Sequence, residues 1–153
     1  MSARSPLAAF SSPADQLAAR AGDFILLIGR IAIAAIFIQS AYGKLLNPAS
    51  FASYLAGQGL PLALPLTYIG IAFEILGALA LIVGFQVRYG VLLLLSFTII
   101  ATLISHRYWE FAGPARETQA VHFLKNLAMI GGLLVLFVNG GGKLGIERMM
   151  GRR

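Results

Sequence analysis

Four long apolar blocks dominate the chain, and each is close to the ~20 residues that a membrane-spanning helix needs. The blocks cover residues 24–46, 61–85, 87–105 and 121–138. Their apolar residues are nearly continuous rather than spaced along one amphipathic face, which is typical of helices surrounded by lipid. The pattern predicts an all-α integral membrane four-helix bundle whose spans run up-down-up-down.

The segment between the first two blocks has the pattern of a short helix. Asn47 and Pro48 are a favourable helix start, and Gly57 and Gly59 favour a stop. Three apolar residues between them share one helical face: Phe51, Tyr54 and Leu55. We expect an interfacial helix between spans one and two, and it could act as a lid.

The ends of the chain differ from its centre. Residues 1–22 are polar and contain Pro6 and Pro13, so we expect a disordered cytosolic arm rather than a cleaved signal peptide. Residues 23–140 form the predicted membrane domain, and residues 141–153 a basic cytosolic tail.

Composition and charge support a membrane protein and exclude several functions. Of all residues, 58% are hydrophobic and 12% are charged, and the formal net charge is +6. The basic residues are dispersed among apolar blocks, so we expect contact with lipid headgroups and no nucleic-acid binding. The chain has no cysteine, which excludes thiolate catalysis, disulfide exchange and iron–sulfur ligation.

Lysine and arginine residues are unevenly distributed between the two sides of the predicted bundle. The positive-inside rule then places both termini in the cytosol. Seven basic residues fall on the cytosolic side: Arg4, Arg20, Arg88, Lys143, Arg148, Arg152 and Arg153. Two fall on the other side, Arg107 and Arg116.

Glu74 is the one charged residue in the apolar stretch 61–85. A charged group at mid-membrane costs roughly 3 to more than 10 kcal/mol, so Glu74 should face protein or a wet cavity. Gly70, Gly77 and Gly84 recur every seven residues beside it, which would let a neighbouring helix approach closely. We therefore predict that Glu74 points into the bundle.

The other spans also carry polar side chains at helical spacing. The candidates are Arg30 and Lys44 on the first span, His106 at the end of the third, and His122, Lys125 and Asn126 on the fourth. A rise of ~1.5 Å per residue puts Arg30 in the inner third of the membrane and the other five toward the outer boundary. We predict that these six residues bind a ligand and that Glu74 is the catalytic residue that carries a proton.

Each candidate also has a simpler interpretation. Lys44 could extend from the end of its span to the headgroups, and the two histidines could be solvated or capping residues. Glu74 and Lys125 could form an ion pair that is only structural. We assign no metal site, although two histidines and one carboxylate could also hold a metal ion, and two histidines haem b.

Several of these residues fall into motifs. They are Arg30, the Gly43-Lys44 pair followed by Asn47-Pro48-x-x-Phe51, Glu74 with Gly77 and Gly84, His106, the run from His122 to Leu127, and Gly131-Gly132. Together they resemble the DoxX family over about residues 22–147. The resemblance implies a four-helix protein of the bacterial inner membrane. Branches of that family are linked to thiosulfate:quinone oxidoreductase, to resistance against catechols and quinones, and to membrane redox complexes.

Three functions remain open from the sequence. The first is a membrane subunit of a quinone-linked oxidoreductase or redox detoxification system, which would need a partner subunit or bound cofactor because no nucleotide-binding fingerprint is present. The second is a non-catalytic anchor or assembly protein. The third is a small proton-coupled exporter, which an inverted repeat would favour; the chain shows none. Under any of the three, the chain could form a homo-oligomer.

Overall fold

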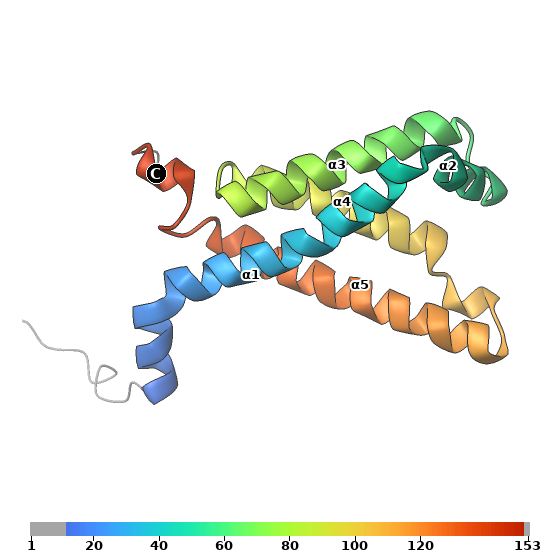
Figure 1. Cartoon of the computed structure of the whole chain (residues 1–153). Coiled ribbons are helices and arrows are strands. Elements are labelled where there is room, and N and C mark those ends of the chain that lie inside the picture. The colour runs from blue at the N-terminus through green and yellow to red at the C-terminus, as the bar shows by residue number, and fades with distance from the viewer. Residues whose placement is uncertain (1–11, 152–153) are drawn as a thin grey trace, which may run out of the picture.

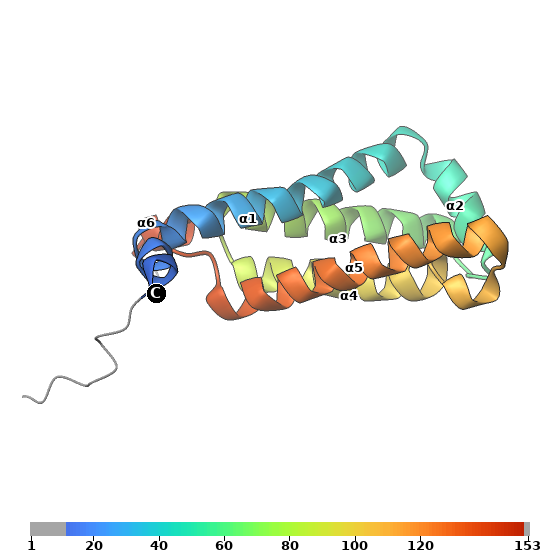
Figure 2. The same cartoon turned by 90° about the horizontal axis from the view of Figure 1, so that it is seen from below.

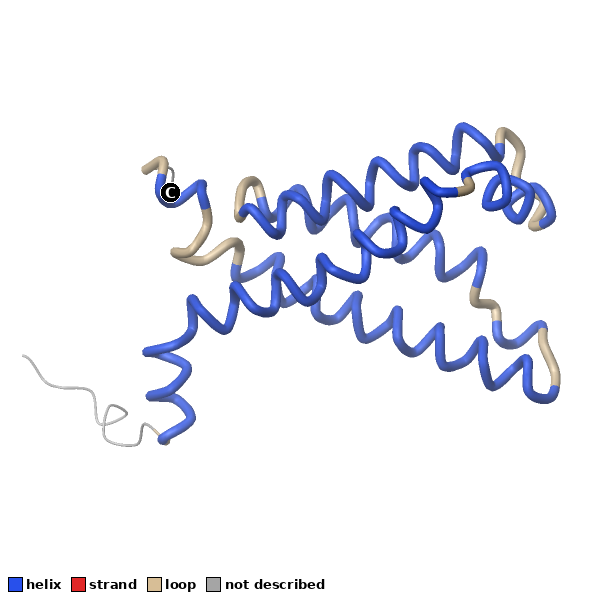
Figure 3. Tube along the Cα trace, viewed as in Figure 1, coloured by secondary structure: helices blue, strands red, loops and turns tan. Residues whose placement is uncertain are grey.

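The computed structural model describes residues 12–151, and every regular element in that range is a helix (Figure 3). Four helices are long and apolar enough to cross a membrane: α1 (Pro13–Leu46), α3 (Ala63–Val83), α4 (Val87–Ser105) and α5 (Gly113–Asn139). The shorter elements are α2 (Pro48–Gly57), the 3-10 turn η2 (Tyr108–Glu110) and α6 (Ile146–Met149). The prediction of an all-α four-span bundle is confirmed.

The first helix begins earlier than the sequence pattern indicated. Ser12 and Asp15 form a capping box, in which each side chain accepts a hydrogen bond from the other residue's backbone N–H, and Pro13 occupies the first turn. These local signals outweigh the polar composition, so residues 13–22 are helical where we expected a disordered arm. Residues 1–11 of that arm lie outside the described part of the chain.

The predicted helix between the first two spans is present as α2. The side chain of Asn47 accepts a hydrogen bond from the backbone N–H of Ser50, and Pro48 follows at the first helical position. Ala52 and Leu55 are its buried residues, and the helix packs on α3. Figure 1 shows α2 at the end of the bundle where α1 ends and α3 begins. We call this end the α2 end.

The four spans do not close into a complete ring. α1 packs along α3, α3 along α4, and α4 along α5, whereas α1 and α5 meet over a much shorter stretch. Figure 1 shows α1 and α5 crossing and then diverging toward the α2 end, and Figure 2 shows them on opposite sides of the bundle. The bundle is therefore open between α1 and α5 in its α2 half.

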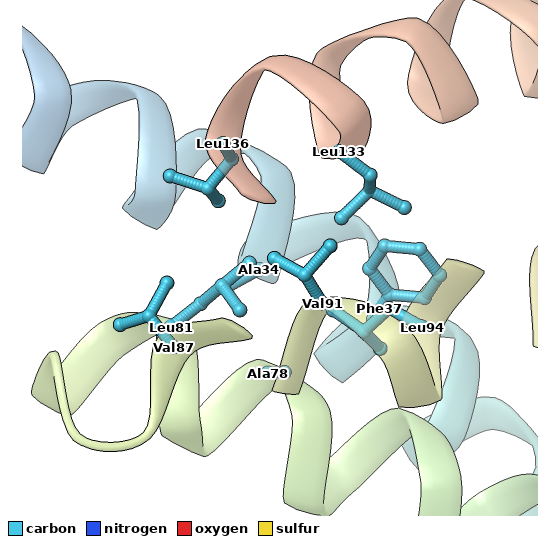
Figure 4. Close-up of a cluster of buried hydrophobic side chains, with 9 residues drawn as sticks. All are labelled: Ala34, Phe37, Ala78, Leu81, Val87, Val91, Leu94, Leu133 and Leu136. Carbon is cyan, nitrogen blue, oxygen red and sulfur yellow. The ribbon is translucent and has the colours of Figure 1, made fainter. Parts of the chain in front are cut away.

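The apolar core occupies the other half, near the turn that joins α3 to α4 at Gly84. Figure 4 shows its nine buried residues, which come from all four spans: Ala34, Phe37, Ala78, Leu81, Val87, Val91, Leu94, Leu133 and Leu136. Phe37 marks the boundary of this core, because it also lines a cavity on the α2 side. The core thus fixes the four helices while leaving the α2 half free for polar groups.

The three glycines at seven-residue spacing do not have one common role. Gly77 lies against Leu94 and Gly90, so it allows the close approach of α3 to α4. Gly70 faces Phe97 on the same helix pair. Gly84 instead ends α3 with a φ of 72°, a conformation that glycine adopts without strain. The prediction that these glycines let a neighbouring helix approach closely is therefore correct for Gly70 and Gly77 only.

The predicted basic tail folds back onto the bundle as far as residue 151. Glu147 accepts a hydrogen bond from the backbone N–H of Gln86 (3.2 Å) and donates its own N–H to the carbonyl of Gly84 (3.3 Å). The backbone N–H of Lys143 donates to Asp23 at 2.9 Å. These contacts tie the segment after α5 to the α3–α4 turn and to α1. Arg4, Arg152 and Arg153 lie outside the described residues.

Candidate functional site

A polar cavity of about 320 Å³ lies in the α2 half of the bundle, above Phe37. Its walls come from α1, α2, α3, α4 and α5, together with His106 just after α4. Five of the predicted site residues line it: Lys44, Glu74, His106, Lys125 and Asn126. The structure therefore brings together side chains from four spans that the sequence could place only by depth.

Glu74 and Lys44 form an ion pair at the centre of the cavity wall. The ammonium Nζ of Lys44 lies 2.7 and 2.9 Å from the two carboxylate oxygens of Glu74. Glu74 has no exposed surface, and the Lys44 side chain is 11% exposed. Lys44 also donates to the hydroxyl of Ser40, one turn earlier on α1, at 2.6 Å. The charge of Glu74 is thus compensated by Lys44 and not by Lys125.

Two aromatic rings flank the Lys44 ammonium. The rings of Phe51 on α2 and Phe97 on α4 lie with their centroids 5.1 and 5.0 Å from Nζ. Both distances are within the range of a cation–π contact. The helix α2 therefore covers one side of the ion pair, and Phe97 borders another side.

Asn126 is held at the cavity wall by a chain of hydrogen bonds to α4. Its amide nitrogen donates to the hydroxyl of Thr102 at 2.9 Å, and that hydroxyl donates to the carbonyl of Thr98 at 2.6 Å. Asn126 is buried, whereas Lys125 beside it is exposed. The pair of residues therefore presents one buried, hydrogen-bonded amide and one exposed ammonium to the cavity.

The two predicted histidines lie next to each other, but only His106 lines the cavity. Their rings stack with centroids 5.1 Å apart at an angle of 25°. The Nδ1 atom of His106 is 2.8 Å from the side-chain oxygen of Gln119, which fixes the orientation of this ring. No three metal-ligating side chains converge among residues 12–151, so the metal alternative has no third ligand there.

Arg30 lies far from this cavity. One of its nitrogens, Nη2, donates to the carbonyl of Leu144 at 3.0 Å, and the side chain is fully buried near Gly84. Helical spacing placed Arg30 and Lys44 on one face of the first span, and Arg30 is indeed buried on α1. That face runs along the whole helix, however, and Arg30 is about 21 Å along it from Lys44. The structure does not bring Arg30 to the other predicted ligand-binding residues.

Comparison with known proteins identifies a family for this chain. A family model of DoxX matches residues 25–107, more than half of the chain. The chain belongs to the DoxX family. The matched region covers Arg30, Lys44, α2, Glu74 and His106, while the part of the cavity contributed by α5 lies beyond it.

Two relatives extend the likeness over most of the chain. Inner membrane protein YphA of Escherichia coli is 30% identical over 124 residues, which is 81% of this chain and 89% of that protein. Inner membrane protein YqjF of the same organism is 30% identical over 132 residues, or 86% and 95% of the two chains. No solved structure matches. Inner-membrane location is thus supported for this DoxX protein by its relatives and by its four apolar spans.

Sequence reasoning missed Ser40 and Phe97, which line the cavity, and Gln119, which contacts His106. Ser40 and Gln119 sit one helical turn before Lys44 and His122, so i−4 and i−3 spacing could have identified them. Phe97 carries no such signal, because it is one apolar residue in an apolar span. Aromatic partners of a buried charge can be recognised only after the helices are placed.

The ion pair leads to a quantitative prediction for double-mutant cycles. Lys44→Met and Glu74→Gln should each lower the free energy of unfolding by about 3–5 kcal/mol, because each leaves a buried charge without its partner. The double variant should lose less stability than the sum of the two single variants, by a coupling energy of about 1–3 kcal/mol. Unfolding in mixed micelles measures all four proteins.

A second cycle with Lys125→Met and Glu74→Gln is the matched comparison. Its coupling energy should be smaller, because the ion-pair contacts of Glu74 in the described chain are all with Lys44. Equal coupling in the two cycles would show that Lys44 is not the specific partner of Glu74.

Proposed function

We propose that this DoxX protein is a membrane subunit of a quinone-linked oxidoreductase or quinone detoxification system, and that its cavity binds the quinone head. The observation that carries the proposal is the Lys44–Glu74 pair, a buried acid and base bordered by Phe51 and Phe97 inside a cavity of about 320 Å³. That volume is within the range of small-molecule sites, which are about 300–1,000 Å³.

The residues around the cavity fit the chemistry of a quinone ring. A quinone carries two carbonyl oxygens, and donors on different walls of the cavity are the ammonium of Lys125 and the hydroxyls of Tyr54 and Ser105. Phe51 and Phe97 offer ring faces and edges against which a flat ring can pack. Reduction of the ring adds negative charge to its oxygens, and the ammonium groups of the two cavity lysines would stabilise that charge.

A second pocket next to the cavity favours a lipid-soluble ligand. It has a volume of about 210 Å³, lies between α2, α3 and α4, and is lined almost entirely by apolar side chains. Phe51, Phe97, Ala101 and Ser105 border both spaces. A molecule with a polar ring and an apolar tail could therefore occupy the two spaces together.

Glu74 is the group of this site that can exchange a proton with the ligand. Lys44 holds the carboxylate and can itself donate, so a proton taken up by a reduced ring oxygen could come from this pair. The electrons must come from elsewhere, because the chain contains no cysteine and no dinucleotide fingerprint. The proposal thus includes a redox partner subunit or bound cofactor; homo-oligomer formation stays a prediction.

We also propose that both termini face the cytosol. Arg88, Lys143 and Arg148 lie together near Gly84, at the end of the bundle opposite α2, and Arg107 and Arg116 lie toward the α2 end. The positive-inside rule favours Arg88, Lys143 and Arg148 on the cytosolic side. The proposed quinone cavity, at the α2 end, would then lie in the outer half of the membrane.

Reporter fusions test this orientation. A reporter that is active only in the periplasm should be inactive at either terminus and active when inserted between η2 and α5. Activity at a terminus with an inactive internal fusion would reverse the orientation and place the cavity in the cytosolic half.

The ion pair also supports a second candidate function, a non-catalytic anchor. Both oxygens of Glu74 are already bonded to Lys44, so the pair could serve only to fix α1 against α3. In that case the neutral pair Lys44→Met with Glu74→Gln, once folded, would behave like the wild type in every respect.

Survival of cells under a quinone challenge separates the two candidates. If the site exchanges protons with a quinone, the Lys44→Met/Glu74→Gln protein should assemble in the membrane yet lose roughly all of the protection, because no titrating pair remains. Glu110→Gln is the matched control, since this exposed carboxylate pairs with Arg107 outside the cavity. If the double variant assembles and its cells survive the quinone challenge as well as wild-type cells do, the result would favour the non-catalytic anchor.

A further inference from the structure

A second polar cavity, of about 380 Å³, lies at the end of the bundle opposite the quinone site. It is formed where α3 ends, α4 begins and α5 ends, so its walls lie at the depth of the lipid headgroups. Three basic residues line it, Arg88, Lys143 and Arg148, together with the carboxylates of Asp23 and Glu147.

Arg30 lies directly behind one wall of this cavity. Its Nη1 atom is against Gly84 and Gly141, which both line the cavity and have no side chain to separate it from the guanidinium. Arg30 is fully buried, and within the described chain its Nε and Nη1 atoms have no hydrogen-bond partner. A buried charge without a counter-charge is costly, so this end of the bundle favours an additional anion.

The two carboxylates of the cavity do not provide that anion. Asp23 accepts the backbone N–H of Lys143 and lies 3.5 Å from its ammonium group. Glu147 accepts the backbone N–H of Gln86 at 3.2 Å. No ion pair joins Arg30 to a carboxylate among residues 12–151. Three basic side chains line the cavity and Arg30 lies behind its wall, whereas only two carboxylates, both already engaged, accompany them.

The loop between α5 and α6 lines the cavity with three successive glycines, Gly140, Gly141 and Gly142. Gly140 and Gly142 have φ values of 68° and 67°, so the backbone turns here in conformations that other residues rarely adopt. A side chain at Gly142 would lie 2.8 Å from Leu26, and glycine avoids this overlap. The result is a wall of bare backbone with basic side chains around it.

From these observations we propose that this cavity binds a phosphate group, either of an anionic lipid headgroup or free in solution. Lys143 and Arg148 contact the phosphate from the exposed side, and its charge offsets that of Arg30 across the glycine wall. The site is independent of the quinone cavity, since none of its residues lines that space.

Thermal unfolding of the purified full chain in a neutral detergent tests the proposal. Saturating short-chain phosphatidylglycerol or inorganic phosphate should raise Tm by roughly 5 °C, because a ligand of the native state stabilises it. Sodium chloride at equal ionic strength and short-chain diacylglycerol should not. A response to phosphatidylglycerol alone identifies the lipid as the source, and a response to both identifies the phosphate group itself.

Variants connect that response to the cavity. Lys143→Gln with Arg148→Gln, both on exposed side chains, should weaken the apparent affinity about tenfold by removing two charged contacts. The matched control, Arg20→Gln with Arg116→Gln, removes the same charge from exposed positions outside the cavity and should leave the affinity unchanged. Arg30→Met should lose the response and be at least as stable as wild type without ligand.

Two results would overturn the proposal. One is the absence of any Tm shift with either phosphate compound in the wild type. The other is an equal shift in the wild type and in the Lys143→Gln/Arg148→Gln protein, which would mean that the anion binds elsewhere.

Discussion

The buried ion pair between Lys44 and Glu74 is the interaction on which the α2 half of this protein depends. A carboxylate with no exposed surface in an apolar span is stable only with a partner, and Lys44 supplies it from the neighbouring helix. The pair joins the end of α1 to the middle of α3. Because Phe51 and Phe97 contact the ammonium, it also positions α2 and α4 around one small space.

The bundle separates two tasks along its length. Its apolar core, near Gly84, packs all four spans and sets their angles. Toward α2 the helices α1 and α5 diverge (Figure 1), and the cavity there is lined by Lys44, Glu74 and Asn126 together with aromatic and aliphatic side chains. Within residues 12–151, the two buried charged residues follow this division. Glu74 is neutralised within the bundle by Lys44, whereas Arg30 lies beside a surface cavity that we propose as an anion site.

Much of this arrangement could be predicted from the sequence, because lipid imposes simple rules on helix length and polarity. The extents of α4 and α2 followed from apolar length and from Asn47-Pro48, and Glu74 was correctly placed inside the bundle. The partner of Glu74 could not be predicted. Lys44 and Lys125 lie at similar depth, and only the packing of α1 along α3, with α5 further away, decides between them.

The remaining differences also have physical causes. Arg30 shares a helix face with Lys44 but lies at a different depth. Helical spacing alone therefore grouped it with ligand-binding residues from which the structure separates it. The start of α1 depends on the Ser12–Asp15 capping box, which outweighs composition. The return of the chain after α5 depends on hydrogen bonds to Gly84 and Gln86 that no local pattern shows.

The most direct test of the central claim is the identity of the molecules that co-purify with the protein. Lipophilic compounds are extracted from the purified wild type and from the Lys44→Met/Glu74→Gln variant, and mass spectrometry identifies them. The comparison shows which compounds need the ion pair in order to bind. Our account predicts a quinone in roughly equimolar amount in the wild type and a large depletion in the variant. No quinone in the wild type, or equal amounts in both proteins, would contradict a quinone site at Lys44 and Glu74.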